Sequence, residues 1–327
     1  MEYWHLSQET RIESAKEFLA VCNALIKGQL VAIPTETVYG LAADATNGQA
    51  CARIYEAKGR PSFNPLISHV DSLDAARTQG EFNDKALALA EAFWPGPLTL
   101  VLPKTKTCTV SELATAGLAS VALRVPQSSI MRALSRQIGK PLAAPSANLS
   151  GKISGTTAED VIADLERHLS WVIDGGATSV GIESTIISLI GERPTLLRPG
   201  GIARTHIEEI LGEPLATAGS DDSAPQAPGM LSSHYAPDNP IRLDATALLD
   251  EDVLITFGAA TIENSERAKR VINLSPAGDL TEAAANLFSA LRKADRESKG
   301  KIAISPIPTT GLGEAINDRL KRAAAPK

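Results

Sequence analysis

Cysteine is scarce in this sequence and shows no pairing pattern. The 327 residues include three cysteines, Cys22, Cys51 and Cys108, which are far apart and form no Cys-x-x-Cys pair. This spacing excludes a disulfide framework and a paired-cysteine zinc site. We expect three reduced thiols and a cytoplasmic protein, because thiols stay reduced in that compartment.

Long apolar segments and an excess of basic residues are also absent. No stretch reaches about eighteen uninterrupted apolar residues, the length that spans a bilayer, and residues 1–5 lack the basic region of a secretion signal. We therefore expect neither secretion nor a membrane span. The formal net charge of −6 argues against a broad basic face laid along nucleic-acid phosphates. Any anion site must be local.

The common phosphate-binding and metal-binding motifs are missing as well. The sequence has no Gly-x-x-x-x-Gly-Lys-Ser/Thr loop, no Gly-x-Gly-x-x-Gly after a strand and no His-Glu-x-x-His. Gly311-Leu312-Gly313 lacks the rest of a dinucleotide fingerprint, and the five histidines show no ligand spacing. We predict no protein-held metal, and we find no residue that stands out as a covalent nucleophile.

The composition that remains is that of a globular protein with two domains. A hydrophobic fraction of 43% and a charged fraction of 21% allow a sizeable core, and the length favours two domains. Alternating helical and strand patterns predict an α/β domain with a mixed sheet over residues 1–212. Residues 213–239 are rich in Pro, Gly, Ser, Ala and Asp, which indicates a linker. Residues 240–327 are predicted to form a small second α/β domain.

Hydrophobic periodicity gives the positions of the elements. Helices are predicted near residues 12–26, 50–58, 85–93, 130–138, 158–168, 205–211, 283–293 and 313–323. Strands are predicted near residues 30–33, 66–70, 98–102, 121–125, 142–144, 171–174, 185–190, 195–198, 253–257, 271–274 and 302–304. The helix at 205 is expected to start with a capping box formed by Thr205 and Glu208.

A pair of cations follows one predicted helix. In Lys58-Gly59-Arg60-Pro61, the glycine ends the helix and the proline forces Arg60 towards an extended conformation. A lone lysine there would only complement the negative end of its helix. Arg60 beside it adds a bidentate fork, and the two cations together suit a phosphate or a carboxylate.

Polar side chains recur where predicted strands end. Ser146 and Asn148 follow the strand at 142–144, at the edge where ligands gather in open α/β sheets. On these two residues alone an ordinary turn is the better interpretation. Ser154 precedes a helix whose free N–H groups suit a phosphate, which favours a site. The segments 34–40, 181–185 and 197–201 repeat the pattern.

Taken together, these motifs resemble the YrdC-like family. The resemblance is carried by segments 34–40, 58–61, 64–67, 94–99, 145–148 and 197–200, and it continues through 227–230, 234–237 and 311–316. It therefore covers nearly the whole chain, in the family's long, two-domain form. The resemblance implies a twisted mixed sheet with a concave cationic cavity, followed by a small C-terminal Rossmann-like α/β domain.

The resemblance also implies an activity. Members of this kind bind ATP and join L-threonine, bicarbonate and AMP into threonylcarbamoyl-AMP, releasing pyrophosphate, for the N6-threonylcarbamoyladenosine modification of tRNA. It implies a nucleotidyltransferase that uses Mg²⁺ brought by ATP. Downstream tRNA threonylcarbamoyl-transferase proteins would take the product, and a local contact with tRNA is a further expectation.

Matching the motifs residue by residue gives the implied site. Catalysis is assigned to Lys58, Arg60, Ser146 and Asn148. ATP binding is assigned to Arg60, Asn64, Ser120, Ser146, Ser154, Arg198 and Ser232. Threonine binding is assigned to Thr37, His69, Arg124, Ala144 and Ser184. Ser232 departs from the family pattern, because some relatives carry an aromatic residue there that can contact the nucleotide.

Two other functions stay open at this stage. An RNA-binding module could use the same cationic cavity without making a product, although the net charge counts against it. A relative that transfers a carbamoyl group from carbamoyl phosphate would be expected to have cysteine-rich segments, which are absent. The linker at 213–239 is also predicted to act as a lid, because segment 228–237 carries apolar, aromatic and proline residues suited to docking.

Overall fold

The computed structural model describes residues 1–7, 11–218 and 234–326. In the first part of the chain, eleven strands form one sheet in the order β1-β8-β2-β3-β7-β4-β6-β5-β9-β10-β11. These strands are β1 (Glu2–His5), β2 (Val31–Ile33), β3 (Gly40–Asp44), β4 (Ile67–His69), β5 (Leu98–Pro103), β6 (Ser120–Arg124), β7 (Leu142–Ala143), β8 (Trp171–Asp174), β9 (Thr185–Ser188), β10 (Thr195–Arg198) and β11 (Ala216–Thr217).

This sheet mixes parallel and antiparallel neighbours: β1, β8 and β2 are parallel, and β2, β3, β7 and β4 are antiparallel in turn. β4 runs parallel to β6, β5 parallel to β9, and the pairs β5–β6 and β9–β10 are antiparallel. β4, β6 and β10 therefore end at the place where β9 begins. The helices of this region are α1 (Lys16–Ile26), α2 (Gly48–Lys58), α3 (Leu73–Gln79), α4 (Asp84–Phe93), α5 (Ser129–Ile138), α6 (Ala158–Leu165) and α7 (Arg204–Leu211), with 3-10 turns η1 (Ile12–Ser14) and η2 (Glu166–His168).

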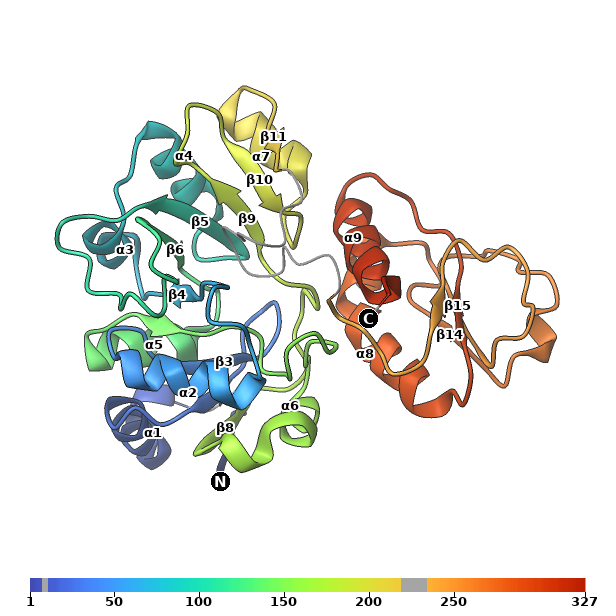
Figure 1. Cartoon of the computed structure of the whole chain (residues 1–327), viewed down its shortest axis with the longest axis horizontal. Helices are drawn as coiled ribbons and strands as arrows, with labels where there is room; N and C mark the ends of the chain where they lie inside the picture. The colour runs from blue at the N-terminus through green and yellow to red at the C-terminus, as the bar shows by residue number, and fades with distance from the viewer. Residues whose placement is uncertain (8–10, 219–233, 327) are drawn as a thin grey trace.

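The last part of the chain forms a second, smaller sheet. Its four strands are all parallel, in the order β12 (Ile241–Arg242), β15 (Ile302–Ile304), β13 (Val253–Thr256) and β14 (Arg270–Asn273). The 3-10 turn η3 (Ser265–Arg267) and the helices α8 (Leu280–Glu297) and α9 (Leu312–Ala324) complete it. Figure 1 shows α8 and α9 on the side of this sheet that faces the first region.

The two regions are packed against each other without a gap at their closest point. Val38, Ile153 and Ile182 of the first region belong to the same apolar cluster as the buried faces of α8 and α9. Gly181, which has a positive φ of 74°, lies against α8: a Cβ at this position would be 2.4 Å from the Cα of Ala285. The backbones touch there, so only glycine fits.

Most predicted elements are present, and the α/β fold with a mixed sheet is confirmed. The strands at 171–174, 195–198 and 302–304 have the predicted bounds. The expected capping box at Thr205 is wrong: α7 begins at Arg204, and its N-cap Ala203 offers no side-chain hydrogen bond. The helix predicted from residue 12 begins instead as η1, and α1 starts at Lys16.

Four strands, β1, β3, β11 and β12, and the helix α3 were not expected from the sequence. β3 reads Gly-Leu-Ala-Ala-Asp, and these small residues have low strand propensity. It forms because β2 and β7 pair with it on both sides and bury all five residues. In the part of the chain that the structure describes, no helix combines the length and the apolar composition needed to cross a membrane.

Candidate functional site

A small, partly enclosed cavity lies where β4, β6 and β10 end and β9 begins. Its volume is about 40 Å³. Polar and charged side chains dominate its wall, and His234 and Tyr235 line it from the end of the linker. Its lining residues are Thr37, Val38, Arg60, Ile67, His69, Arg124, Ala144, Pro145, Ser146, Glu183, Ser184, Arg198, His234 and Tyr235.

Arg60 is fixed by the loop that follows it. α2 ends at Lys58, and Gly59 takes the left-handed conformation that terminates the helix. The Arg60 guanidinium then donates to Oδ1 of Asn64 at 2.6 Å and to the carbonyl of Pro65 at 3.0 Å. Burial lowers the pKa of Arg60 to about 10, so the side chain stays charged at neutral pH.

Lys58 contacts the neighbouring loop rather than the cavity. Its Nζ donates to the carbonyl oxygens of Ser146 and Asn148, and the side chain is buried. Burial, with Arg60 nearby, lowers the pKa of Lys58. The amide of Asn148 donates to the carbonyls of Leu149 and Lys152, at 2.7 and 2.8 Å. Lys58 and Asn148 therefore shape the loop that presents Ser146.

Arg124 ends β6 and is held on three sides. Nε donates to the carbonyl of Gly96 at 3.1 Å, Nη1 donates to Oγ1 of Thr37 at 3.0 Å, and Nη2 donates to Oε1 of Glu36 at 2.5 Å. Glu36 also accepts from the backbone N–H of Gln127 at 3.1 Å. Burial alone would raise the pKa of Glu36, but the nearby charge and hydrogen bond of Arg124 outweigh burial, so the net shift of the pKa is downward. The terminal nitrogens keep further hydrogens that could form a fork for a carboxylate.

Arg198 ends β10 and contacts the start of β9. Its Nη2 donates to the carbonyl of Ser184 at 3.0 Å and to its hydroxyl at 3.2 Å. That hydroxyl also lies 2.8 Å from the hydroxyl of Thr99 on β5. Three arginines, Arg60, Arg124 and Arg198, thus face one cavity from three different strand ends or loops.

Glu183 is the carboxylate among the lining residues, and it is fully engaged. Oε1 accepts from the hydroxyl of Ser154 at 2.6 Å, and Oε2 accepts from Nε of Arg319, on α9 of the second region, at 2.9 Å. Burial alone would raise the pKa of Glu183, but Arg319 and Arg198 together with the Ser154 hydroxyl lower it to about 2. The carboxylate is therefore ionised, and its charge is balanced by an arginine from the second region.

Two histidines of the cavity are neutral. Burial lowers the pKa of His69 to about 3, with Arg124 adding to the effect, and burial likewise lowers the pKa of His234 to about 3. Within the described residues, Nδ1 of each ring has no hydrogen-bond partner. Each can offer a hydrogen bond to a bound molecule without adding charge.

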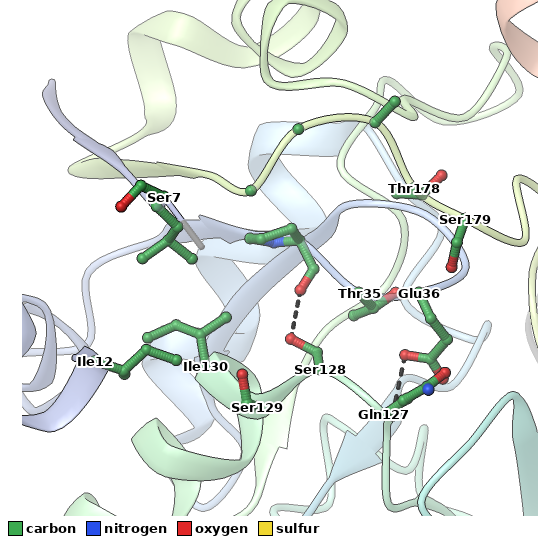
Figure 2. Close-up of a pocket in the computed structure, with 15 residues that line it drawn as sticks. Ser7, Ile12, Thr35, Glu36, Gln127, Ser128, Ser129, Ile130, Thr178 and Ser179 are labelled. Atoms are coloured by element: carbon green, nitrogen blue, oxygen red, sulfur yellow. Dashed lines mark hydrogen bonds between the residues drawn. The ribbon is translucent and has the colours of Figure 1, made fainter. Parts of the chain in front are cut away.

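A second, more open cavity of about 510 Å³ has in its lining Glu36, the partner of Arg124. Figure 2 shows Glu36 in its wall, with the Gln127 N–H donating to the carboxylate, and the Ser128 hydroxyl donating to the carbonyl of Pro34 at 2.7 Å. Among the described residues of this lining, Glu36 is the one that carries a charge, and its carboxylate is committed to Arg124. The wall of this cavity therefore serves to position Glu36, which in turn holds Arg124.

The predicted site residues fall into three groups. Eight of them line the small cavity: Thr37, Arg60, His69, Arg124, Ala144, Ser146, Ser184 and Arg198. Four do not line it but bond to residues that do, Asn148 through its backbone N–H to the carbonyl of Ser146: Lys58, Asn64, Asn148 and Ser154. Ser120 lies at the opposite end of β6 from Arg124 and is not among the lining residues. Ser232 lies outside the described residues.

Sequence reasoning gave no role to Glu36, Glu183 or Arg319. Glu36 and Glu183 stand inside motifs that were singled out, but nothing in those motifs tells which cation each carboxylate meets. For Arg319 a signal existed. It falls between Ile316 and Leu320 on the apolar face of α9, where an arginine needs a buried partner.

This geometry defines a class of protein first. Arginines converging on a small cavity lined mostly by polar side chains, at strand ends of a mixed sheet, are suited to an enzyme domain that takes anionic substrates. The comparisons with known proteins then give the family. The Sua5/YciO/YrdC family model, described as telomere recombination, matches residues 23–200, and the model of the C-terminal domain of threonylcarbamoyl-AMP synthase matches residues 202–325.

Individual relatives match over nearly the whole chain. The threonylcarbamoyl-AMP synthase of Bacillus subtilis is 40% identical, with 98% of this chain and 97% of that protein covered. The threonylcarbamoyl-AMP synthase of Pyrococcus abyssi is 41% identical, with 96% and 95% covered. The crystal structure of P. abyssi Sua5 complexed with L-threonine superposes with a TM-score of 0.89 at 36% identity, covering 99% of this chain and 98% of that chain. The chain belongs to the threonylcarbamoyl-AMP synthase family, in its two-domain form, which confirms the YrdC-like resemblance.

Proposed function

We propose that this protein is an enzyme that makes threonylcarbamoyl-AMP and pyrophosphate from L-threonine, bicarbonate and ATP. The product would serve the N6-threonylcarbamoyladenosine modification of tRNA. The observation that carries the proposal is the placement of Arg60, Arg124 and Arg198 around one cavity, in a chain that matches threonylcarbamoyl-AMP synthases over nearly its full length.

The arginines suit the two anionic substrates. Arg124 is proposed to bind the carboxylate of threonine, because its terminal nitrogens retain hydrogens beside the Thr37 hydroxyl and the neutral His69. Arg60 and Arg198 are proposed to bind the phosphates of ATP. Ile67 lines the cavity and belongs to a buried apolar cluster with Val101, Ala122, Ile186 and Leu197 on the same sheet, and the nucleobase is proposed to pack beside Ile67.

The proposed chemistry needs no covalent intermediate on the protein. The amine of threonine attacks the carbon of bicarbonate, an N–C bond forms, and water leaves to give a carbamate. A carbamate oxygen then attacks the α-phosphorus of ATP, a new P–O bond forms, and the bond to the leaving pyrophosphate breaks. The protein contributes by holding both anions in line and by placing guanidinium groups where negative charge develops. Ser146 is proposed to orient the phosphates, from the loop that Lys58 and Asn148 fix.

Magnesium is proposed to arrive with the nucleotide. Among the described residues, no group of three histidine, cysteine or acidic side chains could hold a metal ion. The carboxylate that faces the cavity, Glu183, is already bonded to Arg319 and Ser154. The phosphates of ATP are therefore the proposed ligands of Mg²⁺, in keeping with the ion's preference for oxygen ligands and retained waters.

We also propose that the linker closes the site after ATP has bound. Of the predicted lid, the described residues His234 and Tyr235 line the cavity, and the N–H of Ala236 donates to the carbonyl of Gly151 at 2.8 Å. A closed site would protect the labile product from water. The product is proposed to pass to tRNA threonylcarbamoyl-transferase proteins in the cytoplasm, with any tRNA contact restricted to a local patch.

The test is a reconstitution with purified protein. Incubation with ATP, threonine and bicarbonate should release pyrophosphate and give threonylcarbamoyl-AMP by mass spectrometry, and omitting threonine or bicarbonate should abolish both. Pyrophosphate release without the adduct, or no release at all, would contradict the proposal. Tight binding of tRNA without turnover would instead support the RNA-binding alternative.

A further inference from the structure

The second region contributes one buried charge to the edge of the active site. Arg319 lies on α9, the helix that faces the first region in Figure 1. Its side chain is 0% exposed, and the side chain of its partner Glu183 is 8% exposed. The pair joins residues 136 positions apart and lies across the boundary between the two regions.

Local structure fixes where Arg319 sits. α9 begins directly against the carbonyl of Pro308: a Cβ on Gly313 would lie 1.9 Å from that oxygen, so only glycine fits. Asn317 reinforces this start by donating to the same carbonyl at 3.0 Å. The motif at 311–316, which is no dinucleotide fingerprint, thus sets the axial position of α9. Arg319 follows less than two turns later on the buried face.

Arg319 is connected to the site by consecutive hydrogen bonds. Its Nε bonds to Oε2 of Glu183, and the other carboxylate oxygen bonds to the hydroxyl of Ser154. The same guanidinium lies 5.3 Å from the centre of the Tyr235 ring, which lines the cavity. The next residue after Glu183 is Ser184, which Arg198 holds. Arg319, a side chain of the second region, therefore contacts Glu183 and Tyr235, both of which line the cavity.

The charge balance gives this contact a purpose beyond packing. A site that takes a triphosphate would be weakened by a buried carboxylate in its wall, because like charges repel strongly where water is excluded. Glu183 is such a carboxylate, and Arg319, which also bonds to Asp318 at 2.6 Å, offsets its charge together with Arg198. We propose that Arg319 is a positioning residue for ATP binding: it offsets the charge of Glu183 and orients that carboxylate, which in turn holds the Ser154 hydroxyl.

This inference rests on the proposed function. A purely structural role for Arg319 would change stability and nucleotide binding differently in the variants described next. If Arg319 only docks the two regions, any loss of this ion pair should act through stability. If it acts through charge, removing both charges should restore nucleotide binding, because the amide oxygen introduced by Glu183→Gln can still accept from Ser154. Replacing a buried ion pair by neutral residues is often tolerated, whereas removing one partner leaves an uncompensated charge.

The experiment compares Arg319→Met, Arg319→Lys and the double variant Glu183→Gln/Arg319→Met in the full chain. Steady-state pyrophosphate release gives KM and kcat, and calorimetric titration with ATP gives an affinity that does not depend on turnover. We expect Arg319→Met to raise the KM for ATP about tenfold or more, with a smaller change in kcat. Arg319→Lys should be intermediate, and the double variant should return to within about threefold of the wild type.

The matched control is Arg204→Met, which breaks another ion pair between the same two regions. Arg204 and Glu314 are bonded at 2.7 Å, but their side chains are 24% and 33% exposed and neither lines the site cavity. This variant should keep the wild-type KM for ATP. A wild-type KM in Arg319→Met would overturn the inference, as would a folded double variant that binds ATP as poorly as Arg319→Met.

Two further outcomes separate the possible failures. If thermal unfolding shows that Arg319→Met is not folded, the ATP affinities of the double variant and of Arg319→Lys test the inference instead, because neither variant leaves Glu183 as a buried carboxylate without a partner. If the wild-type protein releases no pyrophosphate with threonine and bicarbonate, the proposed function fails, and the calorimetric titrations with ATP still test the role of Arg319.

Discussion

The two regions both have α/β architecture, but they differ in how many charged side chains they bury and in where those side chains point. The first region buries Glu36, Lys58, Arg60, Arg124 and Arg198 close to the ends of its strands. In the described part of the second region, the buried ionisable side chains are Glu251 and Arg319. Glu251 pairs internally with Arg242 on β12, and Arg319 points back into the first region.

The strand ends of the second sheet show the same difference. Ser305 follows β15 and accepts from the N–H of Phe257 at 3.1 Å, and Ser275 follows β14 and donates to Glu282 at 2.5 Å. These hydroxyls satisfy their own loops, whereas the polar groups of the first sheet face a cavity. A sheet edge becomes a site through the residues placed there and not through its topology. The second region is therefore best understood as a support for the first.

The largest expected effect comes from removing a cation of the first region. Arg60→Ala should lower kcat/KM for pyrophosphate formation by about 10² to 10³, because it removes a charged donor that is already held in place. Arg53→Ala is the matched control. Arg53 lies on α2, and its guanidinium donates to the carbonyl of Gly28 at 2.6 Å, away from the cavity. Equal kinetics and equal ATP affinity in the two variants would remove Arg60 from the site.

A more selective effect is expected from Glu36→Gln. The substitution keeps the shape of the side chain but removes the charge that holds Arg124, so the KM for threonine should rise about tenfold while the KM for ATP stays constant. Varying the two substrates separately measures this. Glu112→Gln, which changes the exposed partner of Lys104, is the control. A rise in the KM for ATP as large as that for threonine would contradict the assignment of Arg124.

The pH dependence of stability should also reflect the first region. Because the pKa of His69 falls to about 3 in the fold, the unfolded chain binds a proton that the folded protein rejects. The contribution of His69 to the free energy of unfolding is therefore complete above the ordinary histidine pKa of about 6.5. It is lost as pH is lowered from there towards 3, by up to about 1.4 kcal/mol per pH unit.

Denaturant titrations at pH 7, 6 and 5 would check this slope. His69→Gln should make it shallower, and the substitution of an exposed histidine of α7, His206→Gln, should leave it as it is. An unchanged slope in His69→Gln would mean that His69 is protonated equally in the folded and unfolded chains.

The smallest effect is expected for the exposed contact between the regions. Arg204→Met should change the free energy of unfolding by no more than about 1 kcal/mol, because exposed ion pairs contribute little and are screened by salt. Denaturant titration at low and high salt measures it. A loss of several kcal/mol would mean that the second region is held mainly by this pair and not by the apolar cluster around Ile182.

The sequence predicted well what depends on local chemistry. Gly59 ends α2 as expected, and Arg60 and Ser146 do line the cavity that their motifs suggested. The partners of each group could not be predicted, because they come from distant segments. Lys58 looks like a phosphate ligand in the sequence, but in the fold two carbonyls of the 146–148 loop accept its hydrogens.

The role of α9 was hidden for the same reason. Its apolar stripe predicted the helix, but the arginine within that stripe has a meaning only once Glu183 is placed opposite it. A short strand of small residues such as β3 was missed because its stability comes from its neighbours and not from its own side chains.

The backbone contact at Gly181 makes the join between the regions sensitive to a single methyl group. An alanine there would meet Ala285 at 2.4 Å and would also disfavour the positive φ. Such a methyl group would act as a wedge: it changes no charge and no hydrogen-bonding group, yet it would force α8 away from the first region. The geometry that brings Arg319 to Glu183 could thus be loosened while every polar residue of the site is kept. Among related sequences, position 181 should therefore accept substitutions far less often than its exposed neighbours, although its side chain is a single hydrogen atom.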